Sequence, residues 1–154
     1  MLNIGDMAPD FSLDTDKDTK ITLLSFLNKK NIVLYFYPKD DTPGCTKEAC
    51  DFRDNIARLN KGDTVVLGVS KDTVASHKKF QLKYQLPFNL LSDVDHKVQE
   101  LYGVWAMKKF MGREFMGTVR TTYLIDKAAK IRHIWRNVSV KGHVDEVAKA
   151  IESL

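Results

Sequence analysis

The order of apolar, helix-forming and turn-forming stretches predicts an α/β fold built around a central sheet. Residues 31–37 and 64–70 are apolar and mostly β-branched or aromatic, as in strands that are covered on both faces. Each is followed by a stretch predicted to be helical, over residues 43–61 and 73–84. Strands that alternate with helices in this way pair in parallel, so the centre of the sheet should be parallel.

Shorter elements complete the predicted architecture. Residues 6–24 alternate weakly around a polar stretch and predict an N-terminal β-hairpin. The remaining elements are a third apolar run (86–91), a short helix (95–102), a strand or irregular hairpin around Gly112 (103–117), a hairpin pair (121–126 and 131–137) and a terminal amphipathic helix (143–154). The late hairpin adds antiparallel strands. This is the layout of a thioredoxin-like sandwich, with a central mixed sheet flanked by helices and an N-terminal β-hairpin.

The composition predicts one globular domain over residues 1–154. The chain is 44% apolar and 29% charged, which excludes disorder and repeat arrays. The longest apolar run, residues 32–37, is far shorter than the roughly 18 residues of a membrane helix. The first residues do not resemble a secretory signal. Two cysteines are too few for a disulfide scaffold, so we expect a cytoplasmic protein whose thiols are kept reduced.

The net charge of +4 is unevenly distributed. Residues 6–18 hold five Asp against one Lys, whereas residues 108–141 hold nine Lys or Arg against two acidic residues. Such asymmetry suggests an acidic partner or a nucleic acid, but a solvated face is the simpler interpretation. Residues 108–113 interleave basic and aromatic side chains without a recognised nucleic-acid motif, so we predict an exposed hairpin and no nucleic-acid partner. A weaker hypothesis is that this basic surface docks an acidic reductant.

The junction between the first buried strand and its helix carries the candidate chemistry, because functional groups of α/β sheets collect at the carboxyl ends of parallel strands. Thr42 is a plausible N-cap and Pro43 suits the first helical position. Cys45 then lies in the first turn, where unpaired N–H groups and the positive end of the helix dipole stabilise a thiolate. The alternative is that Cys45 is simply a small apolar residue of the helix face, with Ala49 and Phe52.

Cys50 is the second cysteine of the same predicted helix. Five helical residues separate two side chains by about 7.5 Å of rise and about 140° of rotation. A disulfide needs Cα atoms within roughly 7 Å and suitably directed Cβ atoms. Cys45 and Cys50 therefore cannot be bridged while the helix is intact. Either they never pair, or oxidation unwinds the first turns.

These residues also carry a family resemblance. Pro38-x-x-x-Thr42-x-x-Cys45, with Glu48 beyond it, resembles the peroxidatic motif of peroxiredoxins. The similarity extends nearly end to end with the Q-type branch, also called bacterioferritin comigratory proteins, through residues 5–11, 35–46, 50–54, 90–93, 102–105 and 120–126. One departure is the turn at 127–130, Lys-Ala-Ala-Lys, where such proteins often carry glycine.

The resemblance implies a role for each residue of the site. Cys45 is expected to attack a peroxide oxygen and become a sulfenic acid. Thr42 is expected to hydrogen-bond the peroxide, and Arg120 to hold the thiolate and peroxide oxygens through its fork of donors. Pro38 is expected to shield the site from water, and Glu48 to orient Arg120.

Cys50 is implied to be the resolving thiol. The expected cycle forms an intramolecular Cys45–Cys50 disulfide, which thioredoxin or a similar dithiol protein reduces. The sequence supports this role independently, because it has no third cysteine. Hydrogen peroxide and small organic hydroperoxides are the expected substrates. No metal, haem or flavin cofactor is expected, since sulfur carries the chemistry, and the branch is often monomeric.

Other classes of function fit the sequence less well. Thiol–disulfide reductases use Cys-x-x-Cys and a proline facing it, and neither that spacing nor a proline before Thr121 is present. A non-catalytic interaction module remains an alternative and predicts an unreactive Cys45. The cysteines and histidines lack structural zinc spacing. Residues 14–18 resemble the start of a calcium loop, but Thr19 and Ser25 replace its essential Gly and Glu.

Overall fold

The computed structural model describes residues 1–154. The strands are β1 (Ser12–Thr15), β2 (Lys20–Thr22), β3 (Asn31–Phe36), β4 (Thr64–Ser70), β5 (Asn89–Ser92), β6 (Trp105–Phe110), β7 (Arg113–Thr118), β8 (Thr121–Ile125) and β9 (Ile131–Trp135). The helices are α1 (Pro43–Asp54), α2 (Ile56–Leu59), α3 (Val74–Tyr84), α4 (Lys97–Leu101) and α5 (His143–Glu152), and a 3₁₀ turn spans Leu23–Phe26. None of these helices has the length and apolar character that crossing a membrane requires.

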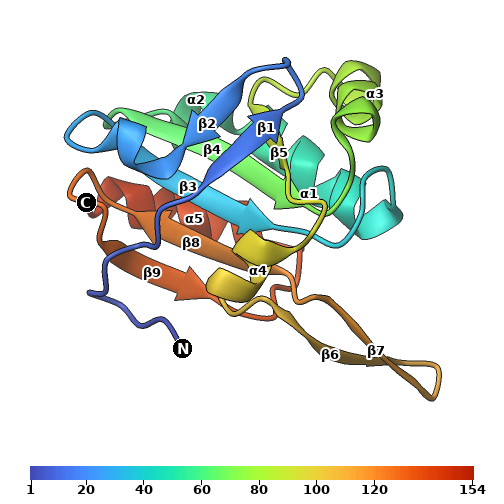
Figure 1. The fold of residues 1–154 in the computed structure, drawn as a ribbon. Coiled ribbons are helices and arrows are strands. Elements are labelled where there is room, and N and C mark those ends of the chain that lie inside the picture. Colours follow the sequence, from blue (N-terminus) through green and yellow to red (C-terminus); the bar gives the residue numbers. More distant parts are fainter.

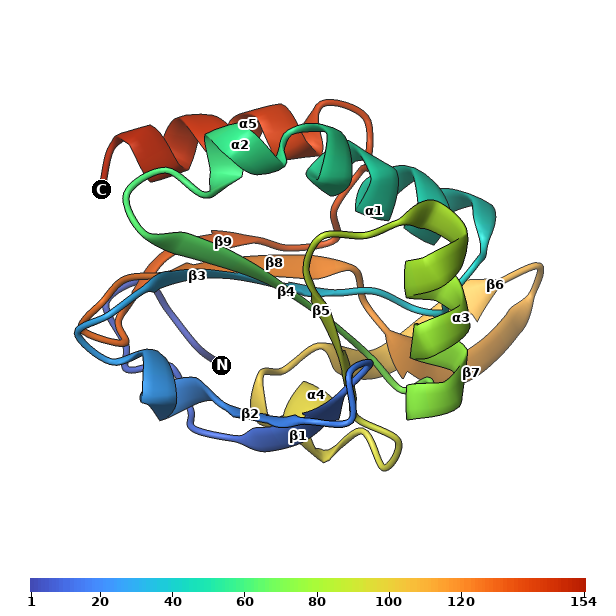
Figure 2. The ribbon, with the colours of Figure 1, turned by 90° about the horizontal axis from the view of Figure 1, so that it is seen from above.

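Seven strands form one mixed sheet in the order β2-β1-β5-β4-β3-β8-β9. β3, β4 and β5 run parallel, whereas β8 pairs antiparallel with β3 and β1 pairs antiparallel with β5. The predicted mixed sheet and N-terminal β-hairpin are confirmed. The sheet is layered between helices: α1, α2 and α5 cover one face, while α4 and the curled-over β1–β2 hairpin lie on the other (Figures 1 and 2).

The central strand β3 divides the hydrophobic core into two layers. Its six residues are all buried and alternate between the faces, as a strand covered on both sides must. Val33 and Tyr35 belong to the layer under α1 and α5, and the alternate residues belong to the layer on the α4 side. Phe52 of α1 stacks on Tyr35 with 4.5 Å between ring centroids. This contact fixes the second half of α1 against the sheet.

The single helix predicted over residues 43–61 is wrong at its C-terminal end. α1 stops at Asp54, and Asn55 leaves helical geometry with φ −113° and ψ 15° before the short α2 begins. The Asn55 side-chain amide donates to the Asp51 carbonyl at 2.9 Å. Asparagine side chains compete in this way with backbone hydrogen bonding, which explains the break. Leu59, at the end of α2, is nevertheless buried in the same core layer as Phe52.

Two turns of unusual composition are stabilised by aspartates. In the 127–130 turn, Ala129 takes φ 61°, which usually favours glycine. Asp126 Oδ1 accepts from the Ala128 and Lys130 N–H groups at 2.9 and 3.0 Å, so the turn forms without glycine. In the β1–β2 turn, Asp16 is buried and accepts from the Leu90 N–H at 3.0 Å. The acidic stretch is thus a polar hairpin turn, as predicted.

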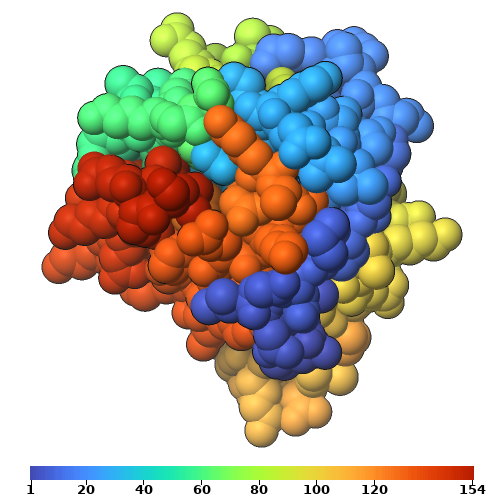
Figure 3. Space-filling view, turned by 90° about the vertical axis from the view of Figure 1, so that its left-hand side faces the viewer, coloured from blue at the N-terminus to red at the C-terminus, as the bar shows by residue number.

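The β6–β7 hairpin projects from the body of the molecule (Figures 1 and 3). Its two strands pair only with each other, and its tip carries exposed Phe110 and Met111. This confirms the exposed hairpin predicted around Gly112. At the opposite end of the chain, the N-terminal segment lies against the 127–130 turn, where Met7 and Lys130 form a β-bridge (Figure 3).

Candidate active site

The site begins where the chain leaves β3 and enters α1. Pro43 occupies the first helical position, as predicted. Thr42 is the N-cap residue with an extended backbone, but its hydroxyl donates to the Lys39 carbonyl at 2.8 Å rather than accepting from the helix. Thr42 is thus the N-cap residue, as predicted, although its side chain makes no capping hydrogen bond to the helix. The first-turn N–H groups, including that of Cys45, consequently have no side-chain cap.

Cys45 is buried in the core layer under α1, yet it has a polar neighbour. Arg120 Nη2 donates to the Cys45 Sγ at 3.4 Å. Arg120 comes from a distant segment, immediately before β8, and β8 lies beside β3 in the sheet. The antiparallel β3–β8 pairing sets Phe36 opposite Thr121, which places Arg120 at the same sheet edge as the loop that leads to Cys45.

Glu48 is the second partner of the Arg120 guanidinium. Arg120 Nη1 donates to Glu48 Oε1 at 2.7 Å, and the Glu48 side chain is fully buried. Glu48 is one turn after Cys45 on the inner face of α1, so one guanidinium spans both side chains. Gly44 leaves room for this arrangement, because a Cβ built there would lie 3.1 Å from Arg120 Nη2.

Glu48 and Arg120, the two charged neighbours of Cys45, both have raised pKa values. Burial raises the pKa of Glu48 to about 7, even though the charge of Arg120 and its hydrogen bond act to lower it. The second carboxyl oxygen, Oε2, has no hydrogen-bond partner. For Arg120, burial acts to lower the pKa, but the charges of Glu48 and Cys45 outweigh it and raise the pKa. Arg120 therefore remains cationic beside the thiol.

An open pocket of about 590 Å³ lies on the solvent side of Cys45, Glu48 and Arg120. Pro38 and Arg120 line it, together with apolar Val119 and Val138. Lys108, in the middle of β6, forms another wall, and its ammonium donates to the Thr118 carbonyl at the base of the β6–β7 hairpin at 2.8 Å. Burial, and then the charge of Arg120, lower the pKa of Lys108. A small polar molecule in this pocket would contact the guanidinium that also contacts Cys45.

The structure brings four of the six predicted site residues together, while Thr42 is bonded to the Lys39 carbonyl and Cys50 lies apart. Cys45, Glu48 and Arg120 are in direct contact, and Pro38 lines the adjacent pocket. Cys50 is half-buried on the same α1, and both thiols are free. The intact helix between them keeps them apart, as its geometry requires.

Two further features near the site are not evident from the sequence. The sequence indicates only an exposed basic hairpin around Lys108, because nothing local shows that this side chain turns back toward Arg120. A buried cluster of Asp40, Ser76 and His77 also lies next to the 39–42 loop. Asp40 is 36 residues from Ser76 and 37 from His77 in the sequence, and only the fold brings it to them.

Comparisons with known proteins place this geometry in a family. Residues 4–134 match the AhpC/TSA family. The chain belongs to that family. It is 51% identical over 146 residues to a putative peroxiredoxin bcp of Coxiella burnetii, covering 95% of this chain and 96% of the relative. It is 46% identical over 153 residues to peroxiredoxin Bcp of Bacillus subtilis, covering 99% and 97%.

Solved structures of AhpC/TSA relatives share the whole fold. A mutant PrxQ of Xylella fastidiosa superposes with a TM-score of 0.93 at 34% identity, covering 99% of this chain and 97% of that one. The bacterioferritin comigratory protein of Xanthomonas campestris, studied for alkyl peroxide reduction, superposes with a TM-score of 0.88 at 35% identity, covering 93% and 90%. The thioredoxin-like fold and the membership among Bcp/Q-type peroxiredoxins are thereby confirmed. These relatives support a thiol peroxidase function.

Proposed function

We propose that this chain reduces hydrogen peroxide and organic hydroperoxides through Cys45, and that thioredoxin or a similar dithiol protein recycles it. The observation that carries the proposal is the guanidinium of Arg120, 3.4 Å from the Cys45 sulfur and braced by a buried carboxyl. A structural core cysteine gains nothing from a buried cation that has to be desolvated to reach it. A nucleophilic thiolate gains a partner that stabilises its charge.

The first step is attack by the Cys45 thiolate on one peroxide oxygen. A new S–O bond forms as the O–O bond breaks, and sulfur is oxidised to a sulfenic acid while the peroxide is reduced. The departing oxygen leaves as hydroxide or alkoxide and takes a proton to become water or an alcohol. Arg120 stabilises the negative charge as it moves from sulfur to the departing oxygen, because its fork of donors serves both atoms.

The other site residues position these groups. The Thr42 hydroxyl, now bonded to the Lys39 carbonyl, can accept a hydrogen bond from the peroxide while donating to that carbonyl. The uncapped first-turn N–H groups of α1 provide donors for an oxygen beside Cys45. Pro38 forms a wall of the pocket and limits access of water. Glu48 fixes the orientation of Arg120 through the 2.7 Å contact.

The second step is attack by the Cys50 thiolate on the sulfenic sulfur. An S–S bond forms, and the sulfenic oxygen leaves as water after taking a proton. Because α1 holds the two cysteines apart, its first turns must unwind. A dithiol reductant then exchanges with the disulfide, restoring both thiols and becoming oxidised itself. The proposed enzyme is a monomeric cytoplasmic protein of one domain that needs no metal or organic cofactor.

Rapid mixing with hydrogen peroxide, followed by quenching and mass spectrometry, tests the proposal. The wild-type protein should lose its Cys45 thiol rapidly and yield a 45–50 disulfide. Cys45→Ser should abolish peroxide consumption. Cys50→Ser is the matched control, and should still form the sulfenic acid but fail to be recycled by thioredoxin. A slow, unselective oxidation of Cys45 would support a non-catalytic thiol. Normal recycling of the Cys50 variant would exclude the resolving role.

A further inference from the structure

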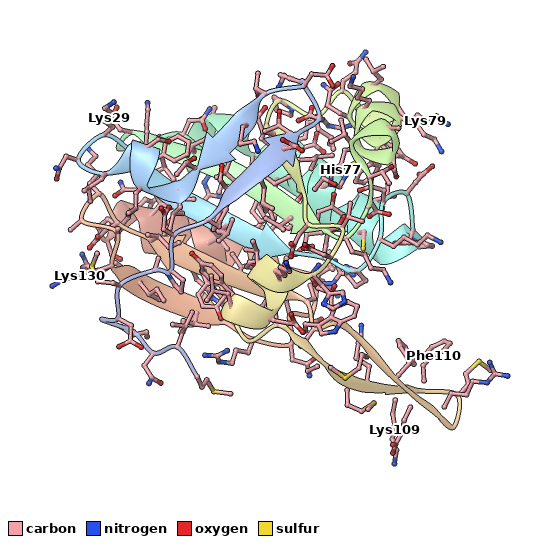
Figure 4. The ribbon with its side chains drawn as sticks, in the orientation of Figure 1. Lys29, His77, Lys79, Lys109, Phe110 and Lys130 are labelled. Carbon is pink, nitrogen blue, oxygen red and sulfur yellow. The ribbon has the colours of Figure 1, made fainter.

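The 39–42 loop, which joins β3 to α1, is tied to helix α3 by a fully buried contact. His77 Nδ1 lies 2.7 Å from Asp40 Oδ2, and the relative exposures of the two residues are 0% and 7%. Figure 4 shows His77 on the inner side of α3, whereas Lys79 of the same helix points outward. Ser76, also on α3, donates to the same Asp40 oxygen at 2.8 Å.

The hydrogen-bond partners of Asp40 and His77 indicate which groups donate and which accept in this contact. Asp40 accepts hydroxyl donors from Tyr37 at 2.6 Å and from Ser76, which a carboxylate does best. The other ring nitrogen of His77, Nε2, lies 3.0 Å from the Leu91 carbonyl, which can only accept. Nε2 therefore donates to that carbonyl, and the contact of Nδ1 with the Asp40 carboxylate is a buried, charge-assisted hydrogen bond.

The same cluster includes Asp72, so a bound metal ion is the first alternative to consider. Ligand atoms of Asp40, Asp72 and His77 all lie within 4.8 Å of one another. However, Asp72 Oδ2 already accepts from the Ser70 hydroxyl at 2.6 Å and from the Asp40 N–H at 2.9 Å. Both His77 nitrogens are also engaged. Hydrogen bonds therefore account for the cluster, and a cation would have to break them.

The contact acts on the part of the chain that carries the peroxide site. Asp40 lies two residues before Thr42, and the Thr42 hydroxyl bonds back across the turn to Lys39. Holding Asp40 therefore holds the turn that places Thr42 and the start of α1. By contrast, the next residue, Asp41, is bound only by exposed partners, Lys83 at 2.8 Å and Tyr84 at 2.8 Å. The buried contact is the stronger restraint on the loop.

We propose that His77 is a positioning residue that holds the 39–42 loop in its peroxide-reactive arrangement and opposes the unwinding of α1 that brings Cys45 to Cys50. This inference rests on the proposed peroxidase cycle. Weakening the His77–Asp40 contact should change the rates of peroxide attack and of disulfide formation in opposite directions. Peroxide attack should slow because Thr42 and the first turn are less well placed. Disulfide formation should accelerate because the loop moves away from α3 more easily.

The experiment measures both steps in a His77→Gln variant. Rapid quench with thiol alkylation and mass spectrometry gives the rate of Cys45 oxidation, the rate of disulfide formation, and the fraction of Cys45 over-oxidised to sulfinic acid at high peroxide. We expect attack to slow about tenfold and disulfide formation to rise about tenfold, the size of one charge-assisted hydrogen bond. The sulfinic fraction should fall. Unchanged rates, or a fall in both, would overturn the proposal.

Two further variants separate positioning from general stability. Ser76→Ala removes one donor to Asp40 from a half-buried site and should shift both rates in the same directions, but less; unchanged rates here would also overturn the proposal. This variant carries the test if His77→Gln does not fold. Lys83→Gln is the matched control, because it removes an exposed partner of the neighbouring Asp41 and should leave both rates unchanged.

A failure of the proposed function gives a different result. If the wild-type chain itself does not react rapidly with peroxide at Cys45, the peroxidase assignment fails, whatever the variants do. If the wild type reacts and forms the disulfide but the His77 and Ser76 variants match it, only the positioning role is excluded.

Discussion

Glu48 shares only one of its two carboxyl oxygens with Arg120: Oε1 accepts a 2.7 Å hydrogen bond, while the fully buried Oε2 has no partner. A buried carboxylate with an unsatisfied oxygen is costly, whereas a protonated carboxyl is less so. The local structure therefore favours a proton on Glu48 up to unusually high pH.

The raised pKa of Glu48 should destabilise the folded state progressively as the pH rises. The folded-state pKa of Glu48 is about 7, against an ordinary value of 4.5. Between these values the folded state binds a proton that the unfolded state has lost, so the contribution of Glu48 to the free energy of unfolding falls as the pH rises from 4.5 to 7. The full effect is on the order of 3 kcal/mol. In chemical denaturation across this range, Glu48→Gln should gain stability relative to the wild type as the pH rises, and a constant difference between the two proteins would show that Glu48 does not have the raised pKa.

His143 should have the opposite effect on stability. Burial, and then the charge of Arg120, lower the pKa of His143 from 6.5 to about 4, and its Nε2 pairs with the Thr122 hydroxyl at 2.8 Å. Between pH 4 and 6.5 the unfolded state binds the extra proton, so stability rises with pH. In the wild type, this rise offsets the Glu48 effect where the two windows overlap. His143→Gln should expose a falling stability curve, and Glu48→Gln a rising one. If the stability of the two variants changed with pH in the same way, the assignment of these opposite effects to Glu48 and His143 would be contradicted.

Replacing Arg120 by lysine tests whether its two contacts are needed together. Lysine keeps the charge but not the planar fork, so one ammonium nitrogen has to replace the two fixed donors, Nη1 and Nη2, that reach Glu48 and Cys45. We expect the second-order rate with hydrogen peroxide to fall about 100-fold, the combined size of two charge-assisted hydrogen bonds. Arg132→Lys, at an exposed ion pair with Asp126, is the control and should retain the wild-type rate. Equal rates for the two variants would remove Arg120 from the mechanism.

Gly44→Ala tests whether the position of the guanidinium matters. Alanine favours a helix over glycine by about 1 kcal/mol, which offsets part of the stability lost when Arg120 shifts away from Glu48. The added Cβ would lie 3.1 Å from Arg120 Nη2 and push the guanidinium away from Cys45. Stopped-flow measurement should show slower peroxide attack. Lys47→Ala, an exposed change on the same helix, should not slow it. Wild-type kinetics in Gly44→Ala would mean that the guanidinium position is not critical.

Local sequence patterns predicted the fold closely, because most elements are defined by their own residues. The buried runs of β3 and β4 and the helix start at Pro43 are of this kind. The end of α1 was missed because the side chain of Asn55 competes with helical geometry, which periodicity does not register. The N-cap position of Thr42 was predicted correctly, whereas the bond from its hydroxyl to the Lys39 carbonyl depends on the geometry of the 39–42 turn.

The candidate site was predictable in part. The position of Cys45 follows from the residues around it, whereas the contact of Arg120 with it depends on the pairing of β8 with β3. The family resemblance identified Arg120 as the partner of Cys45, whereas the local sequence alone did not. The Asp40–His77 contact spans 37 residues and joins side chains that are individually unremarkable. Such contacts depend on tertiary structure, and neither residue type nor spacing indicates them.

The stacking of Phe52 on Tyr35 sets a limit on how far the active-site helix can rearrange. Phe52 is only two residues beyond Cys50 and is completely buried between α1 and the sheet. Melting that reaches Phe52 would open the main hydrophobic core, whereas melting confined to the preceding turns leaves the core closed. In the proposed cycle, each turnover would thus deform a short leading segment, while the remainder of the protein serves as a rigid anchor to which that segment returns.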